Sequence, residues 1–360
     1  MKIFTVVGAR PQFIKAAAVS RVIREKYGGK LREVIVHTGQ HHDKNMSQVF
    51  FDELDIPLPK YNLEISGGGH GEMTGRMLES IEKVLQNERP DWLLIYGDTN
   101  STLAGALAAA KLHIPVAHVE AGLRSFNMRM PEEVNRIVAD KLSALLFCPT
   151  TTAIENLARE GIIAGVHDVG DVMYDVSLFY RDLACGRSRV MEDLGLKDGN
   201  FVLATCHRAE NTDDPLRLHG IVDALADIAE QCSVVLPLHP RTRNMLDSQR
   251  QTNRLGKVQL VDPLPFLDMI RLEQSARAIV TDSGGVQKEA YFFGVPCITT
   301  RDETEWVETV AAGWNQLVGA DTDRILRAFK GLRIPVARPE FYGQGNAAKR
   351  IVNLLLEHCS

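Results

Sequence analysis

Short apolar runs alternate along the chain with longer segments whose apolar residues recur at helical spacing. In the first half of the chain, such runs predict buried strands at 3–7, 33–37, 92–96, 116–119 and 145–148. The segments between them predict helices at 14–25, 46–54, 71–85, 103–112, 132–142 and 152–160. Apolar strands that alternate with helices are typical of an α/β fold with a parallel sheet.

The same alternation occurs again in the second half. It predicts strands at 201–205, 234–237, 258–260, 279–281 and 297–299. It predicts helices at 216–231, 266–274, 286–293 and 322–332. A chain of 360 residues is long for one core. We therefore expect two doubly wound, Rossmann-like domains, with 1–170 as the first and 171–345 as the second.

Two further segments complete the predicted organisation. Residues 171–198 lack strand runs and contain Gly186 and Gly195, so we expect the chain to cross between the domains there. The segment 346–360 predicts a C-terminal helix that can pack back on the first domain.

Composition excludes several classes of function. A net charge of −5 argues against nucleic acid or an anionic membrane as a partner. Apolar segments are too short to span a membrane, and the chain opens on a predicted strand rather than on a signal peptide. The six cysteines show no Cys-x-x-Cys spacing, so we expect reduced thiols in a cytoplasmic protein. Cys206 alone flanks a candidate site, which leaves a catalytic thiol as an alternative.

Carboxylates follow two neighbouring strands of the first half. Asp98 comes directly after the run at 92–96, and Glu120 follows the run at 116–119. A right-handed crossover brings both to the carboxyl edge of the sheet, where open α/β folds bind ligands. Paired acids there indicate proton transfer. Glu132, at the start of the next helix, is a third candidate, although acids also simply stabilise a first helical turn.

Strand-to-helix turns in both halves predict anion sites. In the first turn, Arg10 and Lys15 follow Gly8. The alternative is an ordinary turn with two solvated cations. The sequence here is neither a P-loop nor Gly-x-Gly-x-x-Gly, which argues against a dinucleotide cofactor.

The corresponding turn in the second half reads Asp-Ser-Gly-Gly at 282–285. Ser283, Gly284 and Gly285 are expected to bind phosphate at the helix N-terminus, and Glu289 to accept the hydroxyls of a ribose. Together the motifs indicate a nucleoside diphosphate held between two domains.

Two histidines end neighbouring strands of the second half. His207 and His239, each followed by an arginine, suit diphosphate binding. Buried histidines with purely structural hydrogen bonds are the alternative. The spacing does not favour a metal site, because neither His-x-x-His nor Cys-x-x-Cys is present.

These motifs carry a family resemblance over essentially the whole chain. The chain resembles the non-hydrolysing UDP-N-acetylglucosamine 2-epimerases at residues 8–15, 40–41, 97–102, 118–124, 131–136, 207–211, 239–240 and 282–289. The resemblance implies a GT-B arrangement with the active site in the interdomain cleft, a homodimer, and no metal or nicotinamide cofactor. It implies 2-epimerisation of UDP-GlcNAc to UDP-ManNAc, for surface polysaccharide precursors, through loss of UDP to a 2-acetamidoglucal and re-addition.

The resemblance also implies residue roles. Asp98, Glu120 and Glu132 would be the acid and base carboxylates, and His207, also catalytic, would assist at the diphosphate or in proton transfer. The UDP-binding set would be Arg10, Lys15, His239, Ser283, Gly284, Gly285 and Glu289.

Three departures from the family pattern qualify these roles. Gln12 stands where a glutamate is usual, Trp306 replaces an arginine, and the segment before Pro131 is short. These variants are similar to the branch that epimerises UDP-2,3-diacetamido-2,3-dideoxy-glucuronate, in which Arg129 would meet the C6 carboxylate. Some relatives are activated allosterically by substrate, and Asp43 stands where they have the second glutamine of the loop around Gln40, which argues against such activation here.

Three other functions use the same kind of site. A GT-B glycosyltransferase would use the nucleotide site without removing the C2 proton. A hydrolysing epimerase would release UDP, and a nucleotide-sugar-binding protein would show no turnover.

Overall fold

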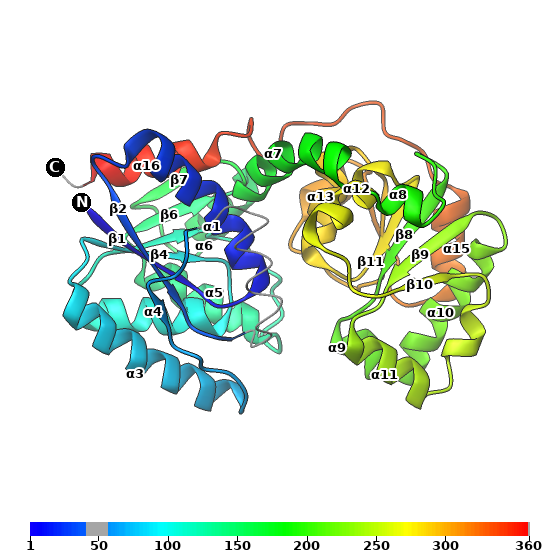
Figure 1. Cartoon of the computed structure of the whole chain (residues 1–360), viewed down its shortest axis with the longest axis horizontal. Helices are drawn as coiled ribbons and strands as arrows, with labels where there is room; N and C mark the ends of the chain where they lie inside the picture. Colours follow the sequence, from blue (N-terminus) through cyan, green and yellow to red (C-terminus); the bar gives the residue numbers. More distant parts are fainter. Residues whose placement is uncertain (41–56, 359–360) are drawn as a thin grey trace. The chain divides into compact units, whose positions relative to one another are not determined.

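The computed structural model describes residues 1–40 and 57–358. The predicted helix at 46–54 and the positions His41 and Asp43 lie outside the described residues. The chain forms two compact units, one of Met1–Val176 with Glu340–Ser360 and one of Ser177–Pro339 (Figure 1).

In the described part of the first unit, seven strands form one parallel sheet in the order β3-β2-β1-β4-β5-β6-β7. The strands are β1 (Lys2–Val7), β2 (Arg32–His37), β3 (Tyr61–Asn62), β4 (Trp92–Tyr96), β5 (Val116–Val119), β6 (Leu145–Cys148) and β7 (Val166–Asp168). The strand order reverses between β1 and β4. That reversal creates the switch point at which open α/β sheets bind ligands.

Helices cover both faces of this sheet. They are α1 (Arg10–Val22), its π-helical extension η1 (Ile23–Tyr27), α3 (His70–Glu88), α4 (Asn100–Lys111), α5 (Pro131–Leu142), α6 (Thr151–Arg159) and α16 (Ala347–Glu357). The C-terminal α16 packs on α1, and Tyr27 donates to Asn353 Oδ1 over 2.6 Å.

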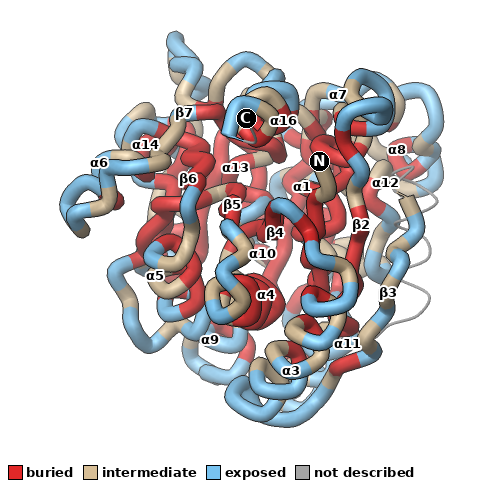
Figure 2. Tube along the Cα trace, turned by 90° about the vertical axis from the view of Figure 1, so that its left-hand side faces the viewer, coloured by how far each residue is buried: buried red, intermediate tan, exposed pale blue. Residues whose placement is uncertain are grey.

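Small residues let α4 approach the sheet closely. Its inner positions are alanines and Gly105, and a Cβ on Gly105 would lie 3.3 Å from Ile95 Cγ2. The helix is among the most buried elements of the unit (Figure 2). This packing fixes the N-terminal turn of α4 directly above the carboxyl end of β4.

In the described residues of the second unit, six strands form a parallel sheet in the order β10-β9-β8-β11-β12-β13. The strands are β8 (Phe201–Thr205), β9 (Ser233–Pro237), β10 (Gln259–Val261), β11 (Ala278–Thr281), β12 (Cys297–Thr299) and β13 (Asn315–Leu317). The helices are α8 (Val190–Asp193), α9 (Ala209–Thr212), α10 (Pro215–Ala229), α11 (Pro240–Ser248), the 3-10 helix η2 (Thr252–Leu255), α12 (Phe266–Ser275), α13 (Gly284–Phe293), α14 (Val307–Ala311) and α15 (Thr322–Lys330).

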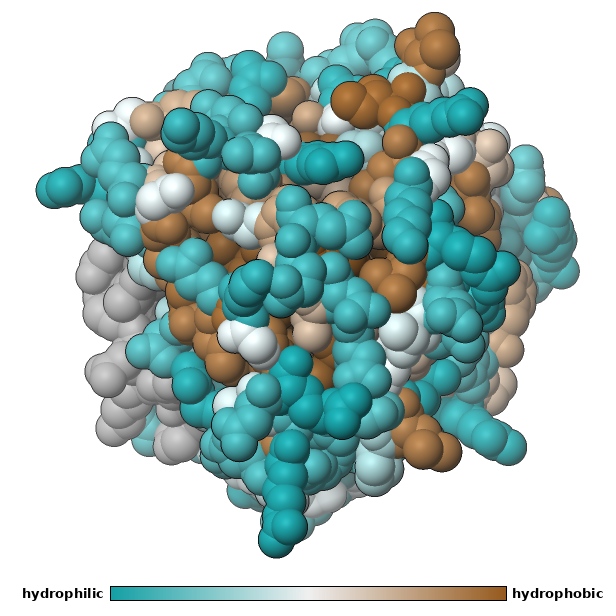
Figure 3. Space-filling model, turned by 90° about the vertical axis from the view of Figure 1, so that its right-hand side faces the viewer, coloured by the Kyte–Doolittle hydropathy of each residue, from teal (hydrophilic) through white to brown (hydrophobic). Residues whose placement is uncertain are grey.

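The predicted fold class, parallel sheets with alternating helices in both halves, is confirmed. A helix, α7 (Val172–Arg187), carries the chain from the first unit into the second. On the face shown in Figure 3, hydrophilic side chains cover most of the surface and interrupt the apolar atoms.

An ionic cluster ties the C-terminal end of α3 to the sheet edge. Lys2, Lys60 and Tyr61 all contact the Glu88 carboxylate, and their hydrogen bonds lower its pKa from 4.5 to about 2. The side chain of Glu88 is 8% exposed. Because the folded pKa lies below the unfolded value, the carboxylate stabilises the fold above about pH 4.5, and this stabilisation is lost as the pH falls toward 2.

We expect Glu88→Gln to lower the unfolding free energy at pH 7 by about 1–2 kcal/mol, since exposed Lys60 contributes little. The difference from wild type should shrink as the pH approaches 2. Urea unfolding across this range measures it. Glu79→Gln, which removes an exposed carboxylate paired with Lys83 on the same helix, is the control. Equal effects of the two substitutions at every pH would refute the role of Glu88.

Candidate functional site

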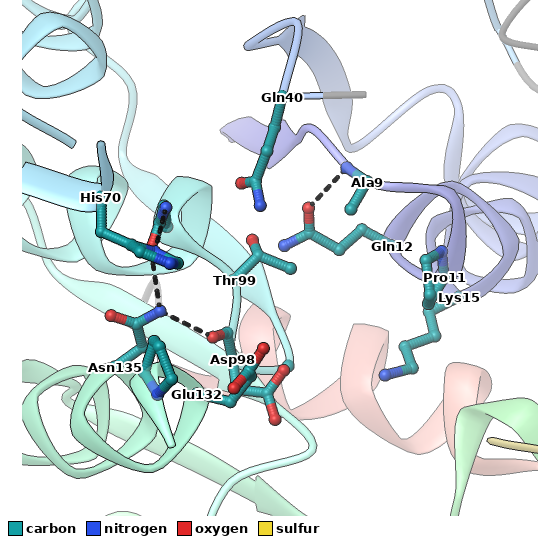
Figure 4. Close-up of a pocket in the computed structure, with 13 residues that line it drawn as sticks. Ala9, Pro11, Gln12, Lys15, Gln40, His70, Asp98, Thr99, Glu132 and Asn135 are labelled. Carbon is teal, nitrogen blue, oxygen red and sulfur yellow. Dashed lines mark hydrogen bonds between the residues drawn. The ribbon is translucent and has the colours of Figure 1, made fainter. Parts of the chain in front are cut away.

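Loops at the carboxyl edge of the first sheet enclose a pocket (Figure 4). It is lined by Ala9, Pro11, Gln12, Lys15, Gln40, His70, Gly97, Asp98, Thr99, Asn100, Pro131, Glu132 and Asn135. These residues come from the turns after β1, β2 and β4 and from the N-terminal parts of α1, α3, α4 and α5. The pocket therefore lies at the switch point of the sheet.

Gln12 joins the turn after β1 to the turn after β4. Its Oε1 accepts from the Gly8 and Ala9 amides at 2.8 and 3.1 Å, and its Nε2 donates to Tyr96 O at 2.8 Å. A glutamate here would have no N–H to donate to that carbonyl, so the departure from the family pattern has a structural consequence. Gly8 is required as well, because a Cβ would lie 2.1 Å from Thr38 Oγ1.

Asp98 is oriented by α5. Its carboxylate pairs with the buried guanidinium of Arg136, which also contacts Glu133 at 3.0 Å. Asn135 Nδ2 donates to the Asp98 carbonyl at 2.9 Å. One turn of α5 thus holds both the backbone and the side chain of Asp98 at the pocket.

Glu120 and Lys15 form an ion pair beside this pocket. If Gly97 carried a Cβ, it would lie 3.2 Å from Glu120 Oε2 and 3.3 Å from Lys15 Nζ, so the pair lies over the residue that precedes Asp98. Glu120 has a φ of 71°, a left-handed conformation that is costly for a residue other than glycine. Strain of this kind is characteristic of functional turns.

Behind these turns lies a buried network centred on Asp140. His118 Nδ1 contacts Asp140 Oδ1 at 2.7 Å, and His118 Nε2 lies 2.7 Å from Gly97 O. Asp140 Oδ2 accepts from Arg124 at 2.7 Å and from the Gly122 amide at 3.1 Å. Burial raises the pKa of Asp140, but His118 and Arg124 more than offset it, so the pKa lies below its usual value.

Both ring nitrogens of His118 have an acceptor within hydrogen-bond distance, the Gly97 carbonyl at Nε2 and the Asp140 carboxylate at Nδ1. The network fixes the turn that carries Asp98 and the turn that follows Glu120.

The two glutamates that open α5 have different surroundings. Glu132 is exposed and lines the pocket with Asp98. Glu133 is buried, and its carboxylate accepts from Ser125 and from the Phe126 amide at 2.9 Å. Glu133 therefore holds the preceding loop and is not available for chemistry.

In the second unit, buried Asp282 joins the ends of β8 and β11. Its carboxylate accepts from the amides of His207 and Arg208 at 3.0–3.1 Å. Ser283 caps α13, and its Oγ accepts from the Val286 amide at 3.4 Å. The His207 side chain stays exposed at the same edge of the sheet.

Charged groups of both signs surround the N-terminus of α13. A Cβ on Gly284 would lie 3.8 Å from Glu305 Oε2 and 3.9 Å from Arg208 Nη2, and one on Gly285 would lie 3.9 Å from Glu289 Oε2. Trp306 covers the ammonium of buried Lys288 at 4.2 Å from the ring centroid. A helix N-terminus with glycines and a guanidinium is suited to a phosphate.

His239 caps α11 and accepts from the Arg241 amide at 3.3 Å. Burial and the neighbouring His207 and Arg241 lower its pKa, which favours the neutral ring. Arg10 opens α1 but is not among the residues that line the pocket.

A reactive thiol, a metal site and a membrane-spanning helix are further features that the structure can test. Burial raises the pKa of the Cys206 thiol well above its usual value, which disfavours a nucleophilic thiolate. In the described part of the chain, no cluster of three or more His, Cys, Asp or Glu side chains is arranged to hold a metal. None of the helices in that part is long and apolar enough to cross a bilayer.

Comparison with known proteins identifies the family of the chain. The family model described as UDP-N-acetylglucosamine 2-epimerase matches residues 25–356. The chain is 55% identical to the UDP-2,3-diacetamido-2,3-dideoxy-D-glucuronate 2-epimerase of Pseudomonas aeruginosa over 99% of both chains. It is 42% identical to the UDP-N-acetylglucosamine 2-epimerase of Methanocaldococcus jannaschii, again over 99% of both.

Solved structures give the same result. A UDP-GlcNAc 2-epimerase of Methanocaldococcus jannaschii in complex with UDP-GlcNAc and UDP superposes with a TM-score of 0.91 at 41% identity, covering 99% of this chain and 100% of the other. The Neisseria meningitidis enzyme bound to UDP-GlcNAc gives 0.90 at 32% identity, with the same coverage. The chain belongs to the UDP-N-acetylglucosamine 2-epimerase family.

Proposed function

We propose that the protein is a non-hydrolysing 2-epimerase of UDP-2-acetamido sugars. The observation that carries the proposal is that Asp98 and Glu132 line one pocket, with the Glu120–Lys15 pair next to it. Inversion at C2 needs one group to remove a proton on one face and another to return a proton on the other. Carboxylates that approach a single pocket from different elements suit this requirement.

The proposed step is an elimination. A carboxylate takes the C2 proton, the C2–H electron pair becomes the C1=C2 bond of a 2-acetamidoglucal, and the C1–O electrons leave with UDP. Re-addition of UDP to C1 and protonation of C2 on the opposite face complete the reaction. Because the C2 proton is weakly acidic, stabilisation of the departing UDP must contribute much of the rate.

We assign the diphosphate to the second unit. Arg208, His207 and the N-terminus of α13 would donate to it, and Glu289 on the same helix would accept the ribose hydroxyls. Asp98 and Glu132 would repel a diphosphate, so the sugar is the part of the substrate that suits their pocket.

The preferred substrate is UDP-2,3-diacetamido-2,3-dideoxy-glucuronate. The 55% identity to an enzyme with that name supports it, as do the departures at Gln12 and Trp306. UDP-GlcNAc is the second candidate, on the strength of the Methanocaldococcus relative and the solved complexes. The homodimer and the cytoplasmic location implied by the resemblance stay predictions.

Incubation with each UDP-sugar, followed by proton NMR, tests the function. We expect one substrate to reach the same mixture of 2-epimers from either side without accumulation of free UDP. UDP and free sugar appearing in equal amounts would instead show a hydrolysing enzyme. Transfer that requires an added acceptor would show a glycosyltransferase, and binding without turnover would show a carrier.

A further inference from the structure

His70 is a pocket residue that the proposed reaction does not use. It begins α3 and lines the same pocket as Asp98 and Glu132, with its ring extended toward them (Figure 4). In the sequence, residues 67–71 indicate only a flexible entry to a helix, or a lid. The structure gives the imidazole a defined hydrogen-bonding state.

A chain of side-chain amides fixes this state. Asn135 Nδ2 donates to Asp98 O at 2.9 Å and to Asn100 Oδ1 at 3.2 Å. Asn100 presents its Nδ2 to His70 Nδ1 at 3.2 Å, and its Oδ1 lies 3.5 Å from the same nitrogen. The shorter approach favours Nδ1 as the acceptor, and the ring proton then lies on Nε2. In that tautomer, Nε2 keeps an N–H that it can donate to a ligand.

The segment that presents His70 is anchored. Arg76, nearly two turns further along α3, donates to Ser66 O at 3.1 Å and to Gly67 O at 2.5 Å. Gly68 has a φ of 86°, and a Cβ there would lie 2.5 Å from Glu72 Oε2, so the turn requires glycine. His70 is thus held at the pocket by a turn that α3 itself supports.

We propose that His70 contacts the substrate and donates from Nε2 to an oxygen acceptor on the sugar half of the UDP-sugar. This inference rests on the proposed function. An N–H donor beside Asp98 and Glu132 is suited to a carbonyl or carboxylate oxygen, to which ionised carboxylates cannot donate. The diacetamido uronate carries such oxygens at C2, C3 and C6, whereas UDP-GlcNAc carries one only in its 2-acetamido group.

Two amide substitutions distinguish the role of Nδ1 from that of Nε2 in His70. His70→Asn places an amide near the position of Nδ1 and lacks a donor at the pocket, whereas His70→Gln reaches the position of Nε2. We expect His70→Asn to raise KM by about 10- to 100-fold with a smaller change in kcat, and His70→Gln to stay within about fivefold of wild type. Binding of UDP alone should be unchanged in both. His113→Asn, the same substitution at an exposed position, is the control.

Comparing the effect of His70→Asn on the two UDP-sugars identifies the oxygen that accepts from His70. A loss confined to the uronate places it at C3 or C6, and an equal loss with UDP-GlcNAc places it on the 2-acetamido group. An active wild type with unaltered kinetics in His70→Asn overturns the proposal. A wild type without turnover instead overturns the proposed function, and the affinity of His70→Asn for the UDP-sugar then decides the role of His70.

The tautomer of His70 can be measured in the wild-type protein, so this test does not depend on whether a variant folds. In the wild-type protein, nitrogen NMR of the histidine rings should find the proton of His70 on Nε2. That signal should shift when UDP-sugar is added, but not with UDP alone. A proton on Nδ1, or no response to the sugar, contradicts the proposal.

Discussion

Asp98→Asn is expected to lower kcat for 2-epimerisation by about two to four orders of magnitude, the range that a positioned acid or base supplies. The amide keeps the shape of the side chain, and Asn135 still holds the backbone carbonyl of residue 98. Glu120→Gln is expected to act similarly and also removes the ion pair with Lys15. Chromatographic separation of the two epimers measures both rates.

The affinity for UDP should be nearly unchanged in Asp98→Asn, because Asp98 is not among the residues proposed to bind UDP. Glu155→Gln, which removes an exposed carboxylate of α6, serves as the control. Rates within tenfold of wild type for both Asp98→Asn and Glu120→Gln would refute the assigned carboxylates.

Asp140→Ala should have the largest effect on stability. Asp140 is 1% exposed and pairs with His118 and Arg124, which are also buried. Removing the carboxylate leaves two buried side chains, His118 and Arg124, without their shared partner, while Arg124 keeps its ion pair with Glu160. We expect a loss of about 3 kcal/mol, the lower end of the range for broken buried pairs. Urea unfolding of the full chain measures the change.

The matched control is Glu155→Ala, whose ion pair with Arg159 is exposed and should contribute less than about 1 kcal/mol. Similar unfolding midpoints for the two variants would contradict the role given to Asp140. Activity should fall with stability in Asp140→Ala, since the network also holds the Gly97 carbonyl and the Gly122 amide.

The long apolar strands could be predicted from the sequence because burial on both faces leaves a continuous hydrophobic run, as in β4 and β8. The strands β3, β7 and β13 were missed. Each has only two or three residues and no fully apolar run, so pairing with a neighbour defines them. The helix α7 was also missed, since its segment indicated only a crossing between domains.

The candidate carboxylates could be predicted because strand ends in a parallel sheet meet at one edge. Their partners could not. Arg136 reaches Asp98 only because α5 packs beside the turn after β4, and His70 reaches the pocket only through the packing of α3. Glu132 and Glu133 are adjacent, so the sequence alone does not distinguish them. Tertiary packing places Glu132 at the pocket and buries Glu133 against the loop that precedes α5.

The family resemblance is confirmed by the comparisons, and two of its departures have a structural account. Gln12 supplies an amide donor that a carboxylate lacks, and Trp306 covers buried Lys288. The proposed contact of Arg129 with a C6 carboxylate gains no support, because Arg129 is exposed and is not among the pocket residues.

The most direct test of the account is turnover in D2O. With its substrate, the enzyme should return UDP-sugar in which the C2 proton has been replaced by deuterium in both epimers, and Asp98→Asn should abolish this exchange. Epimers that keep the original C2 hydrogen, or no exchange with either UDP-2-acetamido sugar, would contradict proton transfer at this pocket.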